Sequence, residues 1–284
     1  MYKIFHIALF VLMLNTSYSC HSKGAPIYSE SIFYIDSIYS NNLSEYRKYN
    51  IYLPKGFDRE KKYKIIYGAD GEMFKDVPFI KATLDSLINN HIIKPTIYIG
   101  SYSNHKIADS TSTISMDGKK LYLLYRNFEY TDRDIQRIED SLLVNRFQNH
   151  MLYFKDELIV KLENKFNQKN NKSDRLFYGF SNGAGFGINL LIMYPNLIGT
   201  YICYSALGSK YKKNVWNKKI QYPDLYIQYG NKESEMFKVE SEALKAKYNE
   251  LNSFVELRVF NGGHDIESWN TEFTKTISEI LKIE

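Results

Sequence analysis

The sequence contains little cysteine and histidine, which limits the chemistry that it can support. Two cysteines, Cys20 and Cys203, occur among 284 residues. If Cys20 near the amino terminus has a role of its own, Cys203 has no partner for an internal disulfide, and its apolar surroundings at 201–204 predict a small buried side chain. The six histidines are scattered, and none pairs with another at the spacing of metal ligands. We therefore expect neither a metal site nor a cofactor.

The chain also lacks a block of basic residues. Its 37 basic and 32 acidic residues give a formal net charge of +5, and both signs are spread along the sequence. Because nucleic-acid binding needs basic residues gathered on one face or element, we expect no nucleic-acid partner. The hydrophobic fraction of 44% is ordinary for a globular protein, and 284 residues can form one large domain.

An apolar run at residues 4–14 is too short to span a membrane and predicts an export signal over residues 1–19. A small residue stands directly before Cys20, which resembles the lipobox of bacterial lipoproteins, where the cysteine is acylated. Ser17 stands where that motif usually has an aliphatic residue, and ordinary signal cleavage accepts the same small residues, so both processing routes stay open. We expect lipidation of Cys20, a polar tether at 20–30, and an exported, membrane-anchored protein, otherwise a periplasmic or secreted one.

From residue 31 onward, segments of strand and helix character alternate. The predicted strands are 32–35, 49–53, 63–67, 96–100, 176–180, 201–205, 225–229 and 254–260, and the predicted helices are 76–90, 151–166, 182–194, 236–251 and a last one that carries Trp269 to Leu281. Repeated strand–helix units predict an α/β fold over residues 31–284, with one mostly parallel sheet and helices on both of its faces. Residues 101–146 interrupt the alternation and are predicted to be a long loop that acts as an insertion or cap.

The most specific motif is Gly179-Phe180-Ser181-Asn182-Gly183, between a predicted strand and a predicted helix. A G-x-S-x-G motif in this place is typical of a nucleophile elbow, in which serine occupies a strained turn. The glycines avoid collisions where strand and helix fold back, and the N–H of Asn182 at the helix start would face a developing oxyanion. The alternative is a glycine-rich turn that only packs tightly or binds phosphate.

A serine hydroxyl becomes a good nucleophile only when a base takes its proton. A histidine in a loop is usually only a solvated side chain, but His264 follows the last predicted strand, in the chain order serine, acid, histidine. The acid is expected after the preceding strand, where Glu233 and Glu235 both occur, and we favour Glu233. Asp224 and Asp265 are further options, although Asp265 is adjacent to the histidine.

The motifs together resemble a known esterase family. They are, in order, Tyr46-Arg47, Ile51-Tyr52-Leu53-Pro54 with Gly56-Phe57, Ile65-Ile66-Tyr67 with Asp70-Gly71, Arg126 with Glu129-Tyr130, Phe154 to Leu158, the serine motif, and Gly262-Gly263-His264 with Trp269. On these residues, positions 31–282 are similar to the family that includes esterase D, enterobactin-type siderophore esterases, feruloyl esterases and mycolyltransferases. The resemblance implies an α/β-hydrolase fold and serine esterase activity.

The resemblance also implies further site residues. The second oxyanion donor would be the N–H of Gly71 or Glu72. Phe180 stands where the family commonly has histidine, Ala184 stands where it has a second glycine, and the acid is Glu rather than the more frequent Asp. These departures remove no catalytic group, but they weaken any transfer of substrate preference.

We therefore expect an exported serine esterase that works through an acyl-enzyme on Ser181, with His264 as base and Glu233 as its partner. Arg126 and Tyr130, in the insertion, are expected to bind the substrate, which would be a siderophore or carbohydrate ester. Two alternatives stay open: an acyltransferase of the same fold, and a lipid-anchored binding protein without activity.

Overall fold

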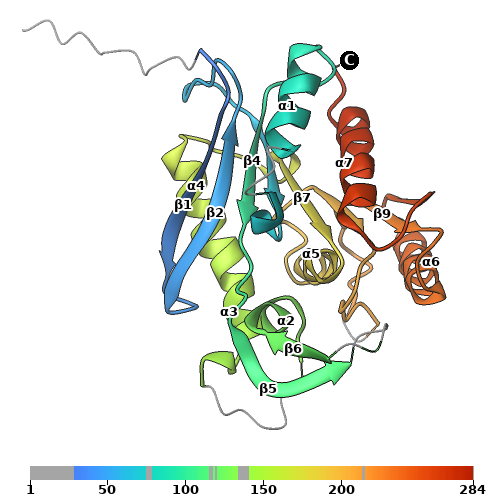
Figure 1. Ribbon diagram of the computed structural model, residues 1–284. Coiled ribbons are helices and arrows are strands. Elements are labelled where there is room, and N and C mark those ends of the chain that lie inside the picture. Colours follow the sequence, from blue (N-terminus) through green and yellow to red (C-terminus); the bar gives the residue numbers. More distant parts are fainter. Residues whose placement is uncertain are drawn as a thin grey trace, which may run out of the picture.

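The computed structural model describes residues 29–74, 79–114, 118, 120–133, 141–212 and 215–283. An eight-stranded sheet forms its centre, in the order β1-β2-β4-β3-β7-β8-β9-β10 (Figure 1). The strands are β1 (Ile32–Ser40), β2 (Glu45–Leu53), β3 (Lys64–Gly68), β4 (Thr96–Ser101), β7 (Arg175–Phe180), β8 (Thr200–Tyr204), β9 (Asp224–Gly230) and β10 (Val255–Phe260). β2 is antiparallel to β1 and β4, and every pair from β4 to β10 is parallel. The predicted, mostly parallel sheet is confirmed.

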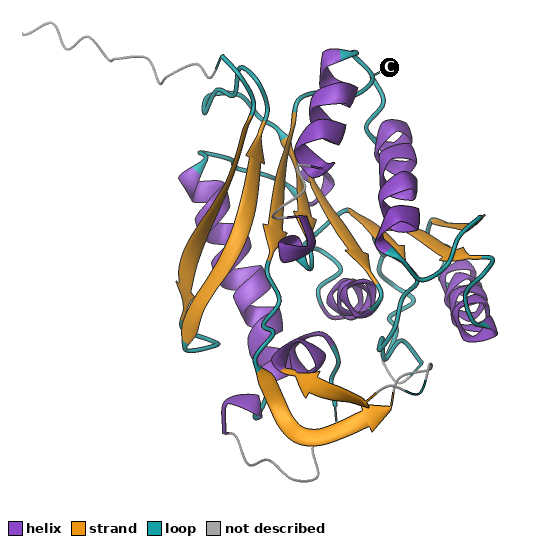
Figure 2. Cartoon of the chain, in the orientation of Figure 1, coloured by secondary structure: helices purple, strands orange, loops and turns teal. Residues whose placement is uncertain are grey.

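Helices cover both faces of this sheet, as predicted (Figure 2). One face carries α1 (Phe79–Asn89) and α7 (Ile266–Ile280), and the other carries α3 (Arg146–Leu152), α4 (Val160–Lys165), α5 (Asn182–Met193) and α6 (Glu235–Glu250). A π-helical segment, Tyr153–Ile159, joins α3 to α4. Because side chains alternate along a strand, Ile65 and Tyr67 of β3 pack on the α5 side, while Ile66 packs on the α1 and α7 side.

The insertion is not a structureless loop. β5 (Ile107–Ile114) and β6 (Lys120–Leu124) pair as a separate antiparallel sheet, and α2 (Tyr125–Tyr130) follows directly. The predicted long loop is therefore wrong for this part of the chain. A polar, Ser/Thr-rich segment has the same composition in a loop and in a solvent-facing hairpin, so composition could not reveal the pairing. These three elements lie together at the lower end of Figure 1.

The two edges of the sheet have different surroundings. The carboxyl ends of the parallel strands point toward α2, β5 and β6, and this edge carries the serine motif (Figure 1). The first strand, β1, begins at the opposite edge. Its first residue, Ile32, pairs with Leu53 at the end of β2. The adjoining Tyr52 pairs with Tyr98 near the start of β4, so the entry of the chain into the sheet lies at the amino ends of the parallel strands.

The predicted export signal at 1–19 and Cys20 lie outside the described residues, as does the predicted tether apart from Ser29 and Glu30. Within the described part of the chain, no helix is long and apolar enough to cross a membrane. Cys203 is buried in β8, as expected for a small hydrophobic residue, and burial raises the pKa of its thiol.

Candidate active site

Ser181 lies at the junction between β7 and α5. Its backbone has φ 53° and ψ −127°, a conformation that costs a non-glycine residue on the order of 1–3 kcal/mol. Neighbouring backbone groups hold it: the N–H of Ser181 donates to the carbonyl of Tyr204 over 2.9 Å, and its carbonyl accepts from the N–H of Leu207 over 3.0 Å. The chain therefore forms the strained strand-to-helix turn that the motif predicts.

Two glycines make this turn possible. A Cβ on Gly179 would lie 2.8 Å from the carbonyl of Gly183, and a Cβ on Gly183 would lie 2.9 Å from Oδ2 of Asp70. Both distances are shorter than real Cβ contacts, so alanine at either position would force β7, α5 or the loop after β3 to move. The close packing leaves Ser181 at the carboxyl edge of the sheet, where it is partly exposed.

The imidazole of His264 lies between Ser181 and Glu233. Its Nε2 is 3.0 Å from Oγ of Ser181, and its Nδ1 is 2.7 Å from Oε1 of Glu233. The second carboxylate oxygen of Glu233 accepts from the N–H of Gly230 over 2.8 Å. The Glu233 side chain is 0% exposed and that of His264 is 31% exposed. With an ionised Glu233 as acceptor, Nδ1 carries the proton and Nε2 can accept from the serine hydroxyl.

Aromatic rings fix the plane of this imidazole. Phe237 of α6 stacks on His264 with 4.8 Å between centroids, and Trp269 of α7 meets it edge-on at 4.7 Å. Trp269 in turn stacks on Phe180, the residue before the serine, at 4.6 Å. The Nε1–H of Trp269 donates to Oγ of Ser205 over 2.9 Å. Phe237 was not among the residues expected at the site, although its position in the first turn of the helix after the acid could have indicated it.

The other candidate acids lie elsewhere. Glu235 is exposed at the start of α6, where it pairs with Lys238 at 3.0 Å. Asp265 caps α7, and the backbone N–H of Ser268 lowers its pKa. Asp224 begins β9 and so lies at the opposite edge of the sheet. Of the four carboxylates considered, the structure brings Glu233 to His264.

The predicted oxyanion donors belong to two adjoining segments. Asn182 is the first residue of α5, and N–H groups in the first turn of a helix have no partner within the helix. Gly71 and Glu72 begin a short 3-10 helix that follows β3. β3 is adjacent to β7 in the sheet, so this helix lies beside the serine turn. The Glu72 carboxylate accepts from the N–H of Ser103 over 2.9 Å, and the Gly71 carbonyl accepts from Nδ2 of Asn50 over 2.8 Å. Only the backbone N–H groups of this segment are candidates for the oxyanion.

Arg126 and Tyr130 of α2 both contact Asp70 in the loop after β3. Tyr130 is 0% exposed, and its hydroxyl accepts from the N–H of Asp70 over 3.1 Å, so the expectation that it contacts substrate is wrong. Arg126 donates through two nitrogens to Asp70 and through a third to Oδ1 of Asn182. Burial disfavours the charged guanidinium, but the Asp70 carboxylate outweighs this and raises the pKa of Arg126. Its guanidinium is thus occupied by the protein.

Two recesses, one of about 410 Å³ and one of about 530 Å³, are each large enough for a small ligand. They lie at different places on the molecule. The larger one adjoins the serine motif, and it is lined by Tyr122, Leu123, Leu124, Asn127, Thr131, Arg133, Asn182, Leu207 and Gly208. The insertion thus supplies most of the wall beside the residue that follows Ser181. Among the described residues, no group of three or more His, Cys, Asp or Glu side chains could hold a metal ion.

Known proteins resemble the chain over most of its length. A family model described as "Putative esterase" matches residues 40–280. In sequence, no curated protein gives a match. Among solved structures, a ferulic acid esterase has a TM-score of 0.67 at 16% identity, over 89% of this chain and 98% of that one.

Two further structures have the same fold. S-formylglutathione hydrolase from Staphylococcus aureus has a TM-score of 0.63 at 14% identity, over 90% of this chain and 99% of that one. An enterobactin esterase from Shigella flexneri has a TM-score of 0.65 at 14% identity, over 90% of this chain and 60% of that one. The predicted α/β-hydrolase fold is confirmed.

Proposed function

Because this chain belongs to the esterase family whose model matches residues 40–280, and is a hydrolase of carboxylic esters, we propose that it works through an acyl-enzyme on Ser181. His264 is the general base and acid, and Glu233 orients it and stabilises its charged form. The N–H of Asn182, together with that of Gly71 or Glu72, binds the oxyanion.

Two half-reactions complete the cycle. In the first, Oγ of Ser181 bonds to the ester carbonyl carbon while Nε2 of His264 takes the serine proton. The tetrahedral intermediate collapses, the carbon–oxygen ester bond breaks, and His264 returns the proton to the departing alkoxide as the alcohol leaves. In the second, water gives a proton to His264 and attacks the acyl carbon, and Ser181 leaves with that proton while the acid is released.

One observation carries this proposal: a continuous chain of contacts at the strained elbow. Oγ of Ser181 lies 3.0 Å from Nε2 of His264, and Nδ1 lies 2.7 Å from Glu233. A glycine-rich turn that only packs or binds phosphate would need neither a serine in a strained conformation nor a histidine beside its hydroxyl. The geometry therefore supports nucleophilic catalysis over the passive alternative.

Hydrolysis of p-nitrophenyl esters by purified variants tests the proposal. Ser181→Ala should abolish turnover, because it removes the oxygen that lies 3.0 Å from Nε2 of His264. Ser86→Ala is the matched control, since Ser86 is exposed on α1, away from the elbow. Full turnover by Ser181→Ala, with a normal circular dichroism spectrum, would remove Ser181 from the mechanism.

The substrate is proposed to be a siderophore or carbohydrate ester. Ferulic acid esterase and enterobactin esterase are the names of two proteins that share the fold, and aromatic and leucine side chains line the recess beside Asn182, which suits an aromatic acyl group. Turnover of a feruloylated sugar, acetylated xylan and a catecholate siderophore would rank the candidates. Adding an alcohol or sugar acceptor to the same assay separates hydrolysis from acyl transfer, since transfer would yield a new ester.

We also propose export and attachment to a membrane through lipid on Cys20. The entry of the chain at the edge opposite Ser181 supports this, because an anchor there leaves the active site facing away from the membrane. The recess of about 410 Å³ at that edge includes the exposed residues Lys62, Lys64, Lys94 and Lys282 in its lining. Lysines near an anionic membrane surface would add to the attraction of a lipid anchor.

A further inference from the structure

A buried ion pair joins α2 of the insertion to the loop after β3. Nε and Nη2 of Arg126 lie 2.6 and 2.7 Å from the two carboxylate oxygens of Asp70. The side chain of Asp70 is 2% exposed and that of Arg126 is 18% exposed. Such a paired, planar contact has a defined geometry, and one that is largely removed from water is screened little by salt.

This ion pair touches both segments that carry the proposed oxyanion donors. Asp70 directly precedes Gly71 and Glu72. Its Oδ2 lies against the first turn of α5, because a Cβ on Gly183 would be 2.9 Å away from it. On the other side, Nη1 of Arg126 donates to Oδ1 of Asn182 over 3.3 Å. One guanidinium therefore spans the gap between the loop after β3 and the residue after the nucleophile.

The backbone of Asp70 needs such support. Its φ is +54°, a left-handed conformation that is unfavourable for a residue with a Cβ and persists when its surroundings hold it. The N–H of Asp70 donates to the hydroxyl of the buried Tyr130 over 3.1 Å. The carbonyl of the next residue, Gly71, accepts from Nδ2 of Asn50 over 2.8 Å. Tyr130, Asn50 and, through the Asp70 carboxylate, Arg126 thus hold the backbone that carries the N–H groups of Gly71 and Glu72.

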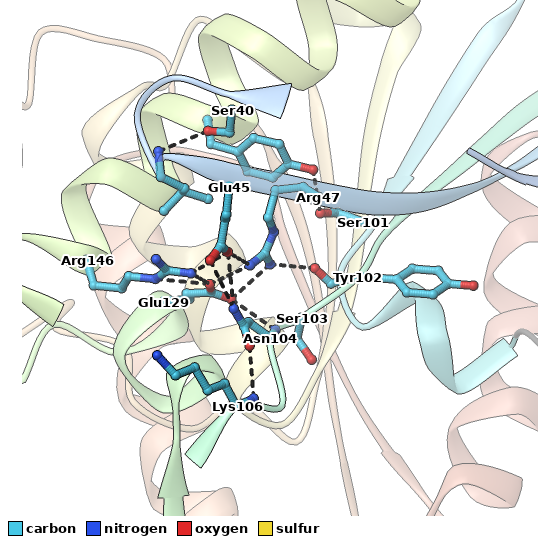
Figure 3. A network of polar contacts seen from close by, with 12 residues as sticks. Ser40, Glu45, Arg47, Ser101, Tyr102, Ser103, Asn104, Lys106, Glu129 and Arg146 are labelled. Carbon is cyan, nitrogen blue, oxygen red and sulfur yellow. Dashed lines mark hydrogen bonds and ion pairs between the residues drawn. The ribbon is translucent and has the colours of Figure 1, made fainter. Parts of the chain in front are cut away.

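α2 is itself anchored by a second buried network (Figure 3). The carboxylate of Glu129, which is 0% exposed, accepts from Nη1 of Arg47 over 2.7 Å and from Nη2 of Arg146 over 2.6 Å. Arg47 belongs to β2 and Arg146 to α3, so α2 is tied to the sheet and to a core helix. Figure 3 shows both guanidinium groups directed at Glu129, with Glu45 beside them. Glu129 is three residues after Arg126, and the network therefore fixes the helix that presents Arg126.

We propose that Arg126 and Asp70 are positioning residues that set the spacing between the two oxyanion-donor segments, an inference that rests on the proposed function. The insertion then has a second task besides lining the recess, because its helix α2 aligns the peptide groups that stabilise the transition state. Substrate binding does not involve the guanidinium directly. Loss of the pair should lower kcat and leave KM nearly unchanged, since the oxyanion forms only after the substrate is bound.

The test compares Arg126→Met, Arg126→Lys and Asp70→Asn with the wild type. Misplacement of catalytic groups by about an ångström costs roughly 10²-fold in rate, and we expect a loss of kcat of this order in each variant. Arg126→Lys should recover little, because an ammonium cannot reproduce the two parallel bonds and the contact with Asn182. The double variant Arg126→Met/Asp70→Asn should lose no more than either single one, as for two members of one pair.

Arg258→Met is the control for loss of an arginine. Arg258 pairs with Glu279 at 2.5 Å on the outer strand β10, and 38% of its side chain is exposed. Its kcat should stay at the wild-type value. A second readout is the affinity for a boronate inhibitor, whose tetrahedral adduct places an oxygen where the oxyanion forms. That affinity should fall with kcat in the Arg126 and Asp70 variants, while the affinity for the product acid stays the same.

Four outcomes would overturn the inference or separate it from the proposed function. A rise in KM with unchanged kcat would make Arg126 a substrate ligand. A lower melting temperature with normal kcat per titrated site would make the pair merely structural. Active-site titration of the wild type comes first. If no acyl-enzyme forms on Ser181, the proposed function fails. If the acyl-enzyme forms normally and kcat is unchanged in Asp70→Asn, only the positioning role fails. Asp70→Asn, which keeps the side-chain shape, and Arg126→Lys, which keeps the positive charge, decide the matter if Arg126→Met does not fold.

Discussion

Replacing Glu233 with glutamine removes one negative charge and keeps the shape of the side chain. Oε1 of Glu233 lies 2.7 Å from Nδ1 of His264, and Oε2 lies 2.8 Å from the nitrogen of Gly230. A carboxylate accepts from both N–H groups, whereas an amide has one oxygen and one NH₂. Because the Glu233 side chain is 0% exposed, solvent cannot replace the lost acceptor.

The backbone N–H of Gly230 cannot reverse its role, so we expect the amide oxygen to keep that bond and the NH₂ group to face His264. Nδ1 must then accept, which moves the imidazole proton to Nε2, the atom that should take the proton of Ser181. Loss of the correct tautomer and of the stabilising charge should lower kcat by about 10³- to 10⁴-fold, or about 4–5.5 kcal/mol in the barrier.

Steady-state hydrolysis of a p-nitrophenyl ester measures this loss, and thermal unfolding followed by circular dichroism checks the fold. Glu235→Gln is the matched control, because Glu235 is exposed and contacts Lys238 rather than the histidine. Its kcat should equal that of the wild type. Near-normal kcat in folded Glu233→Gln, or an equal loss in Glu235→Gln, would refute the assignment of the acid.

Three further predictions concern stability, substrate range and location. His150 is buried, neither ring nitrogen has a hydrogen-bond partner among the described residues, and burial lowers its pKa from 6.5 to about 3. Between pH 7 and pH 5 the unfolded chain therefore binds a proton at His150, whereas the folded chain leaves this residue neutral. The free energy of unfolding should fall by about 2 kcal/mol over this range from His150 alone. Urea unfolding of His150→Gln should lack this part of the pH dependence, and the same pH dependence in the variant and the wild type would contradict the prediction. Tyr122 is 47% exposed on the wall of the recess, so Tyr122→Ala should lower kcat/KM for an aromatic-acyl ester by about tenfold and spare p-nitrophenyl acetate; equal effects on both esters would remove Tyr122 from acyl recognition. Cys20→Ser should move the protein from the detergent phase to the aqueous phase and abolish incorporation of labelled palmitate, whereas Cys203→Ala should not; membrane retention of Cys20→Ser would argue against the anchor.

The location of Ser181 and His264 at one edge of the sheet could be predicted from the sequence. Both follow apolar segments that are recognisable as strands, and the carboxyl ends of parallel strands meet at the same edge. The choice between Glu233 and Glu235 could not be settled in the same way. The two residues share one turn, and which of them faces the histidine depends on a backbone path held by the bond between Glu233 and Gly230.

The surroundings of Arg126 and Tyr130 could not be predicted from the sequence. An aromatic residue in a polar insertion is expected to be exposed, but Tyr130 packs under Asp70, which lies 60 positions earlier in the chain. The partner of Arg126 is the same Asp70, 56 positions earlier in the chain. Local composition carries no record of such long-range contacts, so the sequence could not show that Tyr130 is buried or that the Arg126 guanidinium is paired with Asp70.

The most direct test of the account is the site of covalent labelling by a fluorophosphonate, located by mass spectrometry of peptides from the folded protein. We expect one phosphonyl group, on the peptide that contains Ser181, and loss of labelling in His264→Ala. Labelling at a different residue, or no labelling of a protein that hydrolyses esters, would contradict it.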